Sequence, residues 1–376
     1  MIYIMMVIHM LLKKAGKMKG KFILPLMLLM IFAGCSLFNF GLKLNTTHLD
    51  IPPNAGFIMS PSSGYITVID TKGDSVVGRQ EVAIRRGGKL ENICDFLIHN
   101  GLLFVTLHDR QAFEKGSDVL RILDPVSGKV EESNVGWAPN GIFPVGENLA
   151  FVSTNLICYS DHNCYNYIYN LNTRKVIDTI AFEDALVDFA VSYGDTIIMD
   201  VKYIKADSAS EYFVLYSKES GSIIATHIPL VDDDYANCAV IEGNNLYVGC
   251  TNHIAVFSLP DLTLKKEIYI PNNEEYHDNK NILFTHNKLY TTYFATGGYR
   301  KINIIDADTE EWIKAIDFPE GGARAIDYSL SLDKLFVASD TGGRIYKIDP
   351  NSDEIIDTIN TIENGAFTVI HIKDEN

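Results

Sequence analysis

Short strands of alternating apolar and polar residues recur along the chain, and each ends in Asp or in a polar residue that takes its place. Such alternation is typical of β-strands with one buried face. The first copy runs from Ile66 to Asp70 and the last from Ile345 to Asp349. The end positions are separated by 54, 46, 47, 41, 48 and 43 residues and stand at 70, 124, 170, 217, 258, 306 and 349.

Each copy predicts four strands. Turn-forming residues follow the polar end position, as in Pro350–Asp353, and an alternating strand comes next, as at 355–359. Two more strands precede the end position, as at 238–241 and 246–248. Seven units of this length, without a helical stretch, predict an all-β fold: a seven-bladed β-propeller with four-stranded blades. We name the strands of a blade a to d, from the axis outward.

The two ends of the chain predict how the ring closes. The first copy begins with strand b at Gly56–Met59 and lacks a convincing strand a. Residues 365–372 form an unpaired strand pattern whose opening, Gly365-Ala366, matches Gly322-Ala323 of the preceding copy. We therefore expect the C-terminal strand to become the innermost strand of blade one, which would leave the ring without an open edge.

The first forty residues have the pattern of a targeting segment. Five Lys between positions 13 and 21 precede the apolar run Phe22–Phe32 and then Ala33-Gly34-Cys35. The run is shorter than the roughly 20 residues that span a bilayer. Small residues before a Cys resemble the lipobox of bacterial lipoproteins, although Phe32 stands where that family usually has Leu. The resemblance implies that Cys35 is lipidated; an ordinary signal peptide with an unmodified Cys35 is the alternative.

The lipoprotein resemblance divides the chain into a signal peptide (1–34), a lipidated N-terminus and tether (35–52), and a propeller (53–376). It implies an extracytoplasmic protein held on a bacterial membrane by its lipid. Ser36 after the Cys favours the outer membrane or the cell surface in that family. Met18 also begins a conventional signal, so Met1 and Met18 are both candidate start sites.

Charge narrows the choice of partner. The formal net charge is −16, and without residues 1–34 the chain has 27 basic and 48 acidic residues, a formal charge of −21. Such a field repels nucleic acid and anionic lipid surfaces. We expect a monomer that contacts the membrane through its lipid, a protein or glycan partner in the envelope, and no nucleic acid.

Two pairs of cysteines are candidates for disulfides. Cys158 and Cys164 bracket a short strand–loop–strand segment that could close a bridge. Cys238 and Cys250 flank the turn at 242–245 and would face each other if that turn centres near Asn244; buried thiols are equally compatible with their positions. No Cys and His spacing indicates zinc.

The d–a loops of a propeller converge on the central channel, and here they carry carboxylates in nearly every blade. Turned inward, these oxygen ligands would form an acidic mouth that suits Ca²⁺ or Mg²⁺ better than zinc; the alternative is that they are solvated loop residues. The b–c connections at 107–118 and 204–211 are expected on the opposite face. The candidate ligand residues are Glu183, Asp184, Asp232, Asp233, Asp234, Glu274, Glu275, His277 and Asp278.

The repeated pattern of an apolar strand, Ile-Asp, a turn with Thr or Ser, and Val or Ile resembles the YVTN-type propellers of bacterial surfaces over residues 56–372. This resemblance concerns the fold, which hosts unrelated activities. Nucleotide-binding, metalloprotease and serine-hydrolase motifs are absent from the sequence. We expect a binding or scaffold propeller rather than an enzyme. The alternative is a lactonase-like, metal-dependent hydrolase with His277 beside Glu274 or Glu275.

Overall fold

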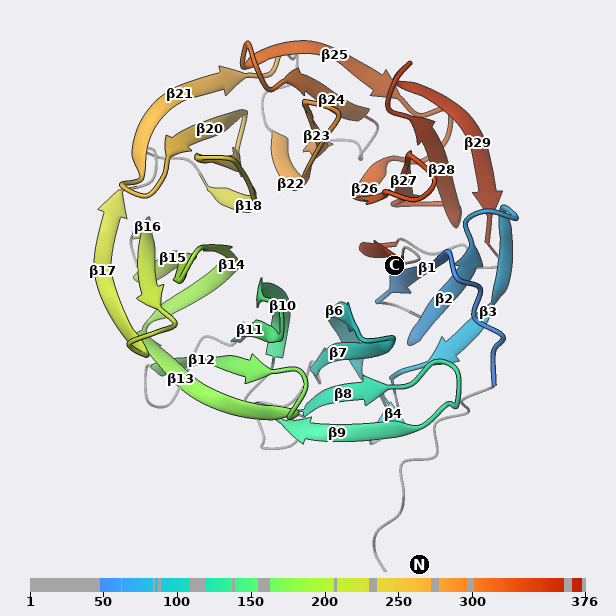
Figure 1. The fold of residues 1–376 in the computed structure, drawn as a ribbon, viewed down its shortest axis with the longest axis horizontal. Coiled ribbons are helices and arrows are strands. Elements are labelled where there is room, and N and C mark those ends of the chain that lie inside the picture. Colours follow the sequence, from blue (N-terminus) through green and yellow to red (C-terminus); the bar gives the residue numbers. More distant parts are fainter. Residues whose placement is uncertain are drawn as a thin grey trace, which may run out of the picture. The chain divides into compact units, whose positions relative to one another are not determined.

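The computed structural model describes residues 48–373 apart from 62, 84, 87–88, 109–118, 137–138, 155–162, 206–207, 230–234, 272–276, 296–300 and 362–366. These residues form seven four-stranded antiparallel sheets arranged as the blades of a ring (Figure 1). The predicted all-β, seven-bladed propeller is therefore confirmed. Within the described ranges, no helix is long and apolar enough to cross a membrane.

The blades follow the chain in order around the ring. Blade one contains β1 (Ala55–Ser60), β2 (Tyr65–Asp70), β3 (Ser75–Glu81) and β30 (Val369–Ile372), and a small ribbon of β4 (Arg85–Arg86) and β5 (Lys89–Leu90) follows it. Blade two contains β6 (Asn92–His99), β7 (Leu102–His108), β8 (Val119–Leu123) and β9 (Val130–Asn134). Blade three contains β10 (Pro139–Gly146), β11 (Leu149–Thr154), β12 (Asn163–Asn170) and β13 (Lys175–Glu183).

The remaining blades repeat the same order. Blade four contains β14 (Ala185–Tyr193), β15 (Thr196–Lys205), β16 (Ser208–Ser217) and β17 (Ser222–Pro229). Blade five contains β18 (Ala236–Glu242), β19 (Asn245–Cys250), β20 (His253–Ser258) and β21 (Thr263–Tyr269). Blade six contains β22 (His277–Thr285), β23 (Lys288–Ala295), β24 (Lys301–Asp306) and β25 (Glu311–Asp317). Blade seven contains β26 (Ala323–Ser329), β27 (Lys334–Ser339), β28 (Arg344–Asp349) and β29 (Glu354–Asn360).

The repeated polar end positions close the c–d turns. The Oδ1 atom of Asp306 accepts the backbone N–H groups of Asp308 and Thr309 at 2.9 and 2.8 Å. Four residues after each end position the backbone adopts a positive φ, at Asp74, Gly128, Arg174, Gly221, Leu262, Glu310 and Asp353. The sequence repeat is therefore the repeat of one tight turn. In six of the seven copies the side chain at the end position accepts an N–H of the turn, whereas Ser258 donates to the carbonyl of Thr263 at 3.2 Å.

The core lies between neighbouring blades. Phe213 of blade four meets Phe257 of blade five edge to face, with ring centroids 5.1 Å apart, in a cluster that includes Phe189 and Leu246. Apolar packing of this kind also joins blade seven to blade one, which contains both ends of the propeller. Each blade therefore buries its apolar face against the next one, and a single blade has no complete core of its own.

The C-terminal strand closes the ring as predicted. β30 pairs antiparallel with β1, from Gly56 opposite Ile372 to Met59 opposite Val369. Phe367 and Ile370 are buried in a cluster with Ile58 of blade one and Phe336 of blade seven. The chain's last strand thus supplies strand a of the first blade.

The register places the d–a and b–c connections at the same end of each blade. In blade four, Ala185 at the start of strand a lies opposite Tyr203, and the b–c hairpin follows directly at Lys205 and Ser208. The expectation that the b–c connections lie on the opposite face was wrong, because consecutive antiparallel strands return every second connection to the same end. We call this end the loop end, and the end with the a–b and c–d turns the turn end.

The structure describes some of the cysteines for which the sequence made predictions. Cys35 and Cys158 lie outside the described residues, so lipidation and the Cys158–Cys164 bridge stay predictions; Cys164 is buried in β12. Cys238 lies opposite Gly249, and Cys250 lies opposite Ala236. The two sulfur atoms contact the carbonyl oxygens of other residues, at 3.4 and 3.7 Å. The strand register therefore does not place these two cysteines opposite each other.

Removal of the closing strand tests this architecture. Loss of Phe367 and Ile370 alone removes about 3–6 kcal/mol of apolar burial, a large part of a typical stability of about 5–15 kcal/mol. A chain that ends at Thr361 should therefore lose its cooperative thermal transition in circular dichroism, whereas a control that ends at Lys373 should melt like the full chain. A normal melting curve for the shorter chain would contradict the closure.

Candidate functional site

Three carboxylates meet in blade four near the loop end, at its junction with blade five. Asp188 comes from β14, Asp200 from β15 and Glu211 from β16, and one oxygen of each lies within 4.8 Å of the others. A β-bulge brings them together, because Val187 pairs with Val201 and Ala190 pairs with Met199. Asp200 therefore lies opposite the bulged segment that contains Asp188.

Asp200 is the most deeply buried member of this carboxylate cluster. It is 0% exposed, and among the described residues neither carboxylate oxygen has a hydrogen-bond partner. Burial raises the pKa of Asp200 well above its usual range, and the nearby Glu211 and Asp188 carboxylates raise it further. An ionised carboxylate in this position needs a positive charge beside it.

The other two carboxylates have partners. The Oε2 atom of Glu211 accepts the backbone N–H of Ala236 in blade five at 2.9 Å. The Lys202 ammonium lies 3.2 Å from Glu211 Oε1, 4.0 Å from Asp188 Oδ2 and 3.7 Å from the centre of the Tyr235 ring. Burial also raises the pKa of Glu211. One lysine therefore faces three carboxylates, and the donors that remain are hard oxygen atoms.

A second set of acids lines the inner strands near blades one, two and seven. Asp95 Oδ2 on β6 accepts the N–H of Ile142 at 3.0 Å, and Asp327 Oδ2 on β26 accepts the N–H of Ile372 at 2.7 Å. His371 Nδ1 on β30 lies 3.8 Å from Asp327 Oδ2. These carboxylates bind the N–H groups of the neighbouring blade's inner strand and so link one blade to the next.

The predicted ligand residues lie in several places. Glu183 ends β13 with an exposed side chain, and Asp184 follows at a positive φ of 50°. His277 and Asp278 lie at the start of β22, on the inner strand of blade six. The remaining predicted acids lie outside the described residues: Asp232, Asp233, Asp234, Glu274 and Glu275. Of the residues that follow the first three, Ala236 donates to Glu211 and the Tyr235 ring contacts Lys202. The acidic mouth stays a prediction, and the carboxylate cluster was not indicated by the sequence.

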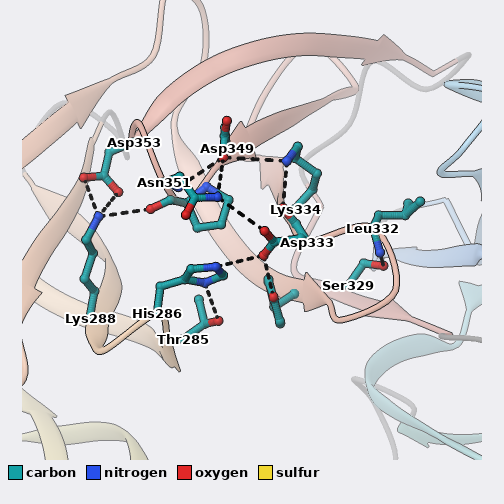
Figure 2. Close-up of polar contacts among 12 residues, drawn as sticks. Thr285, His286, Lys288, Ser329, Leu332, Asp333, Lys334, Asp349, Asn351 and Asp353 are labelled. Atoms are coloured by element: carbon teal, nitrogen blue, oxygen red, sulfur yellow. Dashed lines mark hydrogen bonds and ion pairs between the residues drawn. The ribbon is translucent and has the colours of Figure 1, made fainter.

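Figure 2 shows a different polar network, at the turn end between blades six and seven. Thr285 Oγ1 lies 3.0 Å from His286 Nδ1, and His286 Nε2 lies 2.9 Å from Asp333 Oδ1. The Tyr328 hydroxyl also donates to Asp333, at 2.7 Å. The order of hydroxyl, imidazole and carboxylate is that of a hydrolase triad. However, Thr285 is 8% exposed and precedes the two left-handed residues of a hairpin turn, so we assign this network to the junction between the blades.

Among the described residues, the three most exposed aromatic side chains lie toward the loop end, in blades three and five. Tyr165 is the third residue of β12, just after the b–c connection of blade three, Tyr235 lies just before β18, and Tyr269 ends β21. They are 40%, 41% and 64% exposed. The most exposed isoleucines, by contrast, lie on outer strands closer to the turn end, at Ile177 and Ile224. The two ends of the ring therefore present different surfaces.

Comparison with known proteins supports the fold. No protein-family model matches the sequence, and no curated protein matches it. A solved structure of the dihydro-heme d1 dehydrogenase NirN in complex with DHE is similar, with a TM-score of 0.56 and 12% identity over 87% of this chain and 76% of that chain. In all, 1342 solved chains match, so the shape alone does not select a function.

The inner-strand acid Asp95 gives a prediction for pH dependence. Burial raises the pKa of Asp95 to about 6 from an ordinary value of 3.8, against the opposing effects of the Ile142 N–H and His371. A carboxyl with a raised folded-state pKa favours folding at low pH, and this contribution is lost as the pH rises through the folded pKa. Wild-type stability should therefore fall between pH 4 and 6, by at most about 2 kcal/mol because solvent screens a half-buried group.

In Asp95→Asn this fall should be smaller, as measured by urea unfolding at pH 4.5 and 7. The exposed Asp317→Asn serves as the control and should keep the wild-type profile. Equal pH profiles for Asp95→Asn and wild type would show that Asp95 is ionised throughout this range.

Proposed function

We propose that the chain is a lipid-anchored propeller of the bacterial envelope that binds a protein or glycan partner at its loop end. The observation that carries this proposal is that the exposed Tyr165, Tyr235 and Tyr269 all lie toward that end. Tyrosine presents a large apolar ring with a hydrogen-bonding tip, and it is enriched in binding surfaces. Single exposed aliphatic residues, which lie elsewhere on the ring, are ordinary for a soluble surface.

The charge and the amino-terminal pattern support the location and the type of partner. A formal charge of −21 beyond residue 34 disfavours nucleic acid and anionic lipid as ligands. The lipobox-like Ala33-Gly34-Cys35 supports attachment through a lipid. The resemblance of the repeats to YVTN-type surface propellers supports the same placement, outside the cytoplasm.

The hydrolase alternative would need a carboxylate that a substrate can reach. The carboxylate cluster of blade four has oxygen donors suited to a metal, but Asp200 is 0% exposed and the Glu211 side chain 4%. A hydrolytic metal centre keeps an open coordination position for water and substrate. Of the three carboxylates only Asp188, whose side chain is 33% exposed, is open to solvent, and the burial of the other two favours a role inside the scaffold over hydrolysis.

The anchor can be tested at Cys35. Cells that express the chain and grow with an alkyne-tagged fatty acid should incorporate the tag, and the purified chain should begin at Cys35 in mass spectrometry. Cys35→Ala should abolish the tag, and Cys94→Ala, the control, should keep it. An untagged wild-type chain cleaved elsewhere would instead support an ordinary signal peptide.

The binding face can be tested with substitutions at the two ends. Each tyrosine at the centre of an interface contributes on the order of 2 kcal/mol or more. Tyr165→Ser with Tyr269→Ser should therefore reduce the yield of envelope partners cross-linked in intact cells at least tenfold. Ile177→Ser with Ile224→Ser, at the turn end, should leave the yield unchanged. Cross-links that map to the turn end, or that survive the tyrosine substitutions, would contradict the proposal.

A further inference from the structure

The junction between blades four and five departs from a rule that five other junctions obey. In each of the other blades with a bulged strand a, the strand b residue opposite the end of the bulge is small or carries a hydroxyl group. These residues are Thr106, Ser153, Gly249, Thr292 and Ala338. Blade four has Asp200 at this place. The fold accepts a small or hydroxyl residue there, so it does not itself require a carboxylate.

The hydroxyl groups at this position show what surrounds it. Thr106 donates to the carbonyl of Asn140 at 3.0 Å, and Thr292 donates to the carbonyl of Arg324 at 3.2 Å. Asn140 and Arg324 are the bulged residues of the next blade's strand a. In the next blade after Asp200 the bulged residue is Asn237. The equivalent positions lead us to expect that the Asn237 carbonyl faces Asp200. An ionised carboxylate cannot hydrogen-bond to this carbonyl, whereas a cation between them would bind both.

The remaining buried charges of the described residues show how this protein treats a charge in its interior. The buried Arg121 pairs with the buried Glu91 at 2.8 Å, and the buried Asp353 pairs with Lys288 at 2.8 Å. Asp200 forms no ion pair within the described ranges, and the nearest ammonium, Lys202, contacts Glu211. An unpaired buried carboxylate costs several kcal/mol if it is ionised, so Asp200 needs either a proton or a cation as its partner.

Charge and spacing define that partner. The three carboxylates and Lys202 leave two negative charges, which one divalent cation would balance. Ca²⁺ binds oxygen atoms at about 2.3–2.6 Å, so ligands on opposite sides of the ion are up to about 5 Å apart, whereas Mg²⁺ requires about 4 Å. Oxygen atoms that lie within 4.8 Å of one another fall inside the span of a Ca²⁺ site. Both oxygens of Asp200 remain available for bidentate binding, which Ca²⁺ accepts.

We propose that Asp188, Asp200 and Glu211 bind one Ca²⁺ ion at the junction of blades four and five. The ion joins three strands of blade four. Because Glu211 also holds the N–H of Ala236, the ion fixes the start of blade five, beside Tyr235 at the loop end. The site is structural, and it does not depend on the partner proposed above.

The test uses the full chain, purified in detergent and stripped with EDTA. Calorimetric titration with CaCl₂ should show one saturable site, and Ca²⁺ should raise the melting temperature. Asp200→Thr copies Thr106 and Thr292, so this variant should fold. It should melt above the wild type in EDTA, because the unpaired carboxylate is gone, and it should lose the response to Ca²⁺.

Glu211→Gln retains an acceptor for the Ala236 N–H and should bind Ca²⁺ at least tenfold more weakly than the wild type. The exposed Asp317→Asn is the matched control and should bind like the wild type. Absence of saturable Ca²⁺ binding, or binding that Asp200→Thr and Glu211→Gln leave unchanged, would overturn the site. Equal affinity for MgCl₂ would overturn the assignment to calcium. None of these measurements involves a binding partner, so failure of the partner proposal would leave them unaffected.

Discussion

The contact between neighbouring blades is the interaction on which the rest of the structure depends. A four-stranded blade buries its apolar face only against the next blade, as Phe213 does against Phe257. The ring must therefore be complete for any blade to be stable. The last strand satisfies this requirement by pairing with the first. Hydrogen bonds between blades, such as that from the N–H of Ile372 to Asp327, are directional and supplement the apolar packing, which is not.

Asp200 is important because it lies at such a contact and carries a carboxylate where the equivalent residues of other blades are small or carry a hydroxyl group. Sequences usually break a local rule of their fold where function or strain requires it. A hydroxyl group at this position would satisfy the next blade's carbonyl, as Thr106 and Thr292 do. The carboxylate needs a positive partner, and a cation there would hold together the strands beside the exposed Tyr235. The proposed cation and the proposed binding face thus meet at one end of the molecule.

The sequence was sufficient for the fold because its signals are local and periodic. Asp70, Asp306 and their equivalents each close one turn, so their number gives the number of blades. The unpaired strand pattern near Ile370 indicates how the ring closes. The carboxylate cluster could not be predicted in the same way. Asp188, Asp200 and Glu211 come from three strands, and a bulge shifts their register by one residue. The available signal was one charged residue, Asp200, in the apolar stretch 196–201. Only a comparison of the strand registers shows which residues of the other blades are equivalent to it.

The most direct test of the account is to locate the cation by diffraction. Crystals of the full chain grown with CaCl₂, measured at a long wavelength, should give one anomalous peak within about 2.3–2.6 Å of Asp200 and Glu211 oxygen atoms. The same peak should lie beside the carbonyl of Asn237. Absence of a peak at this junction, with Asp200 instead donating a proton to a neighbouring acceptor as a neutral acid, would contradict the account.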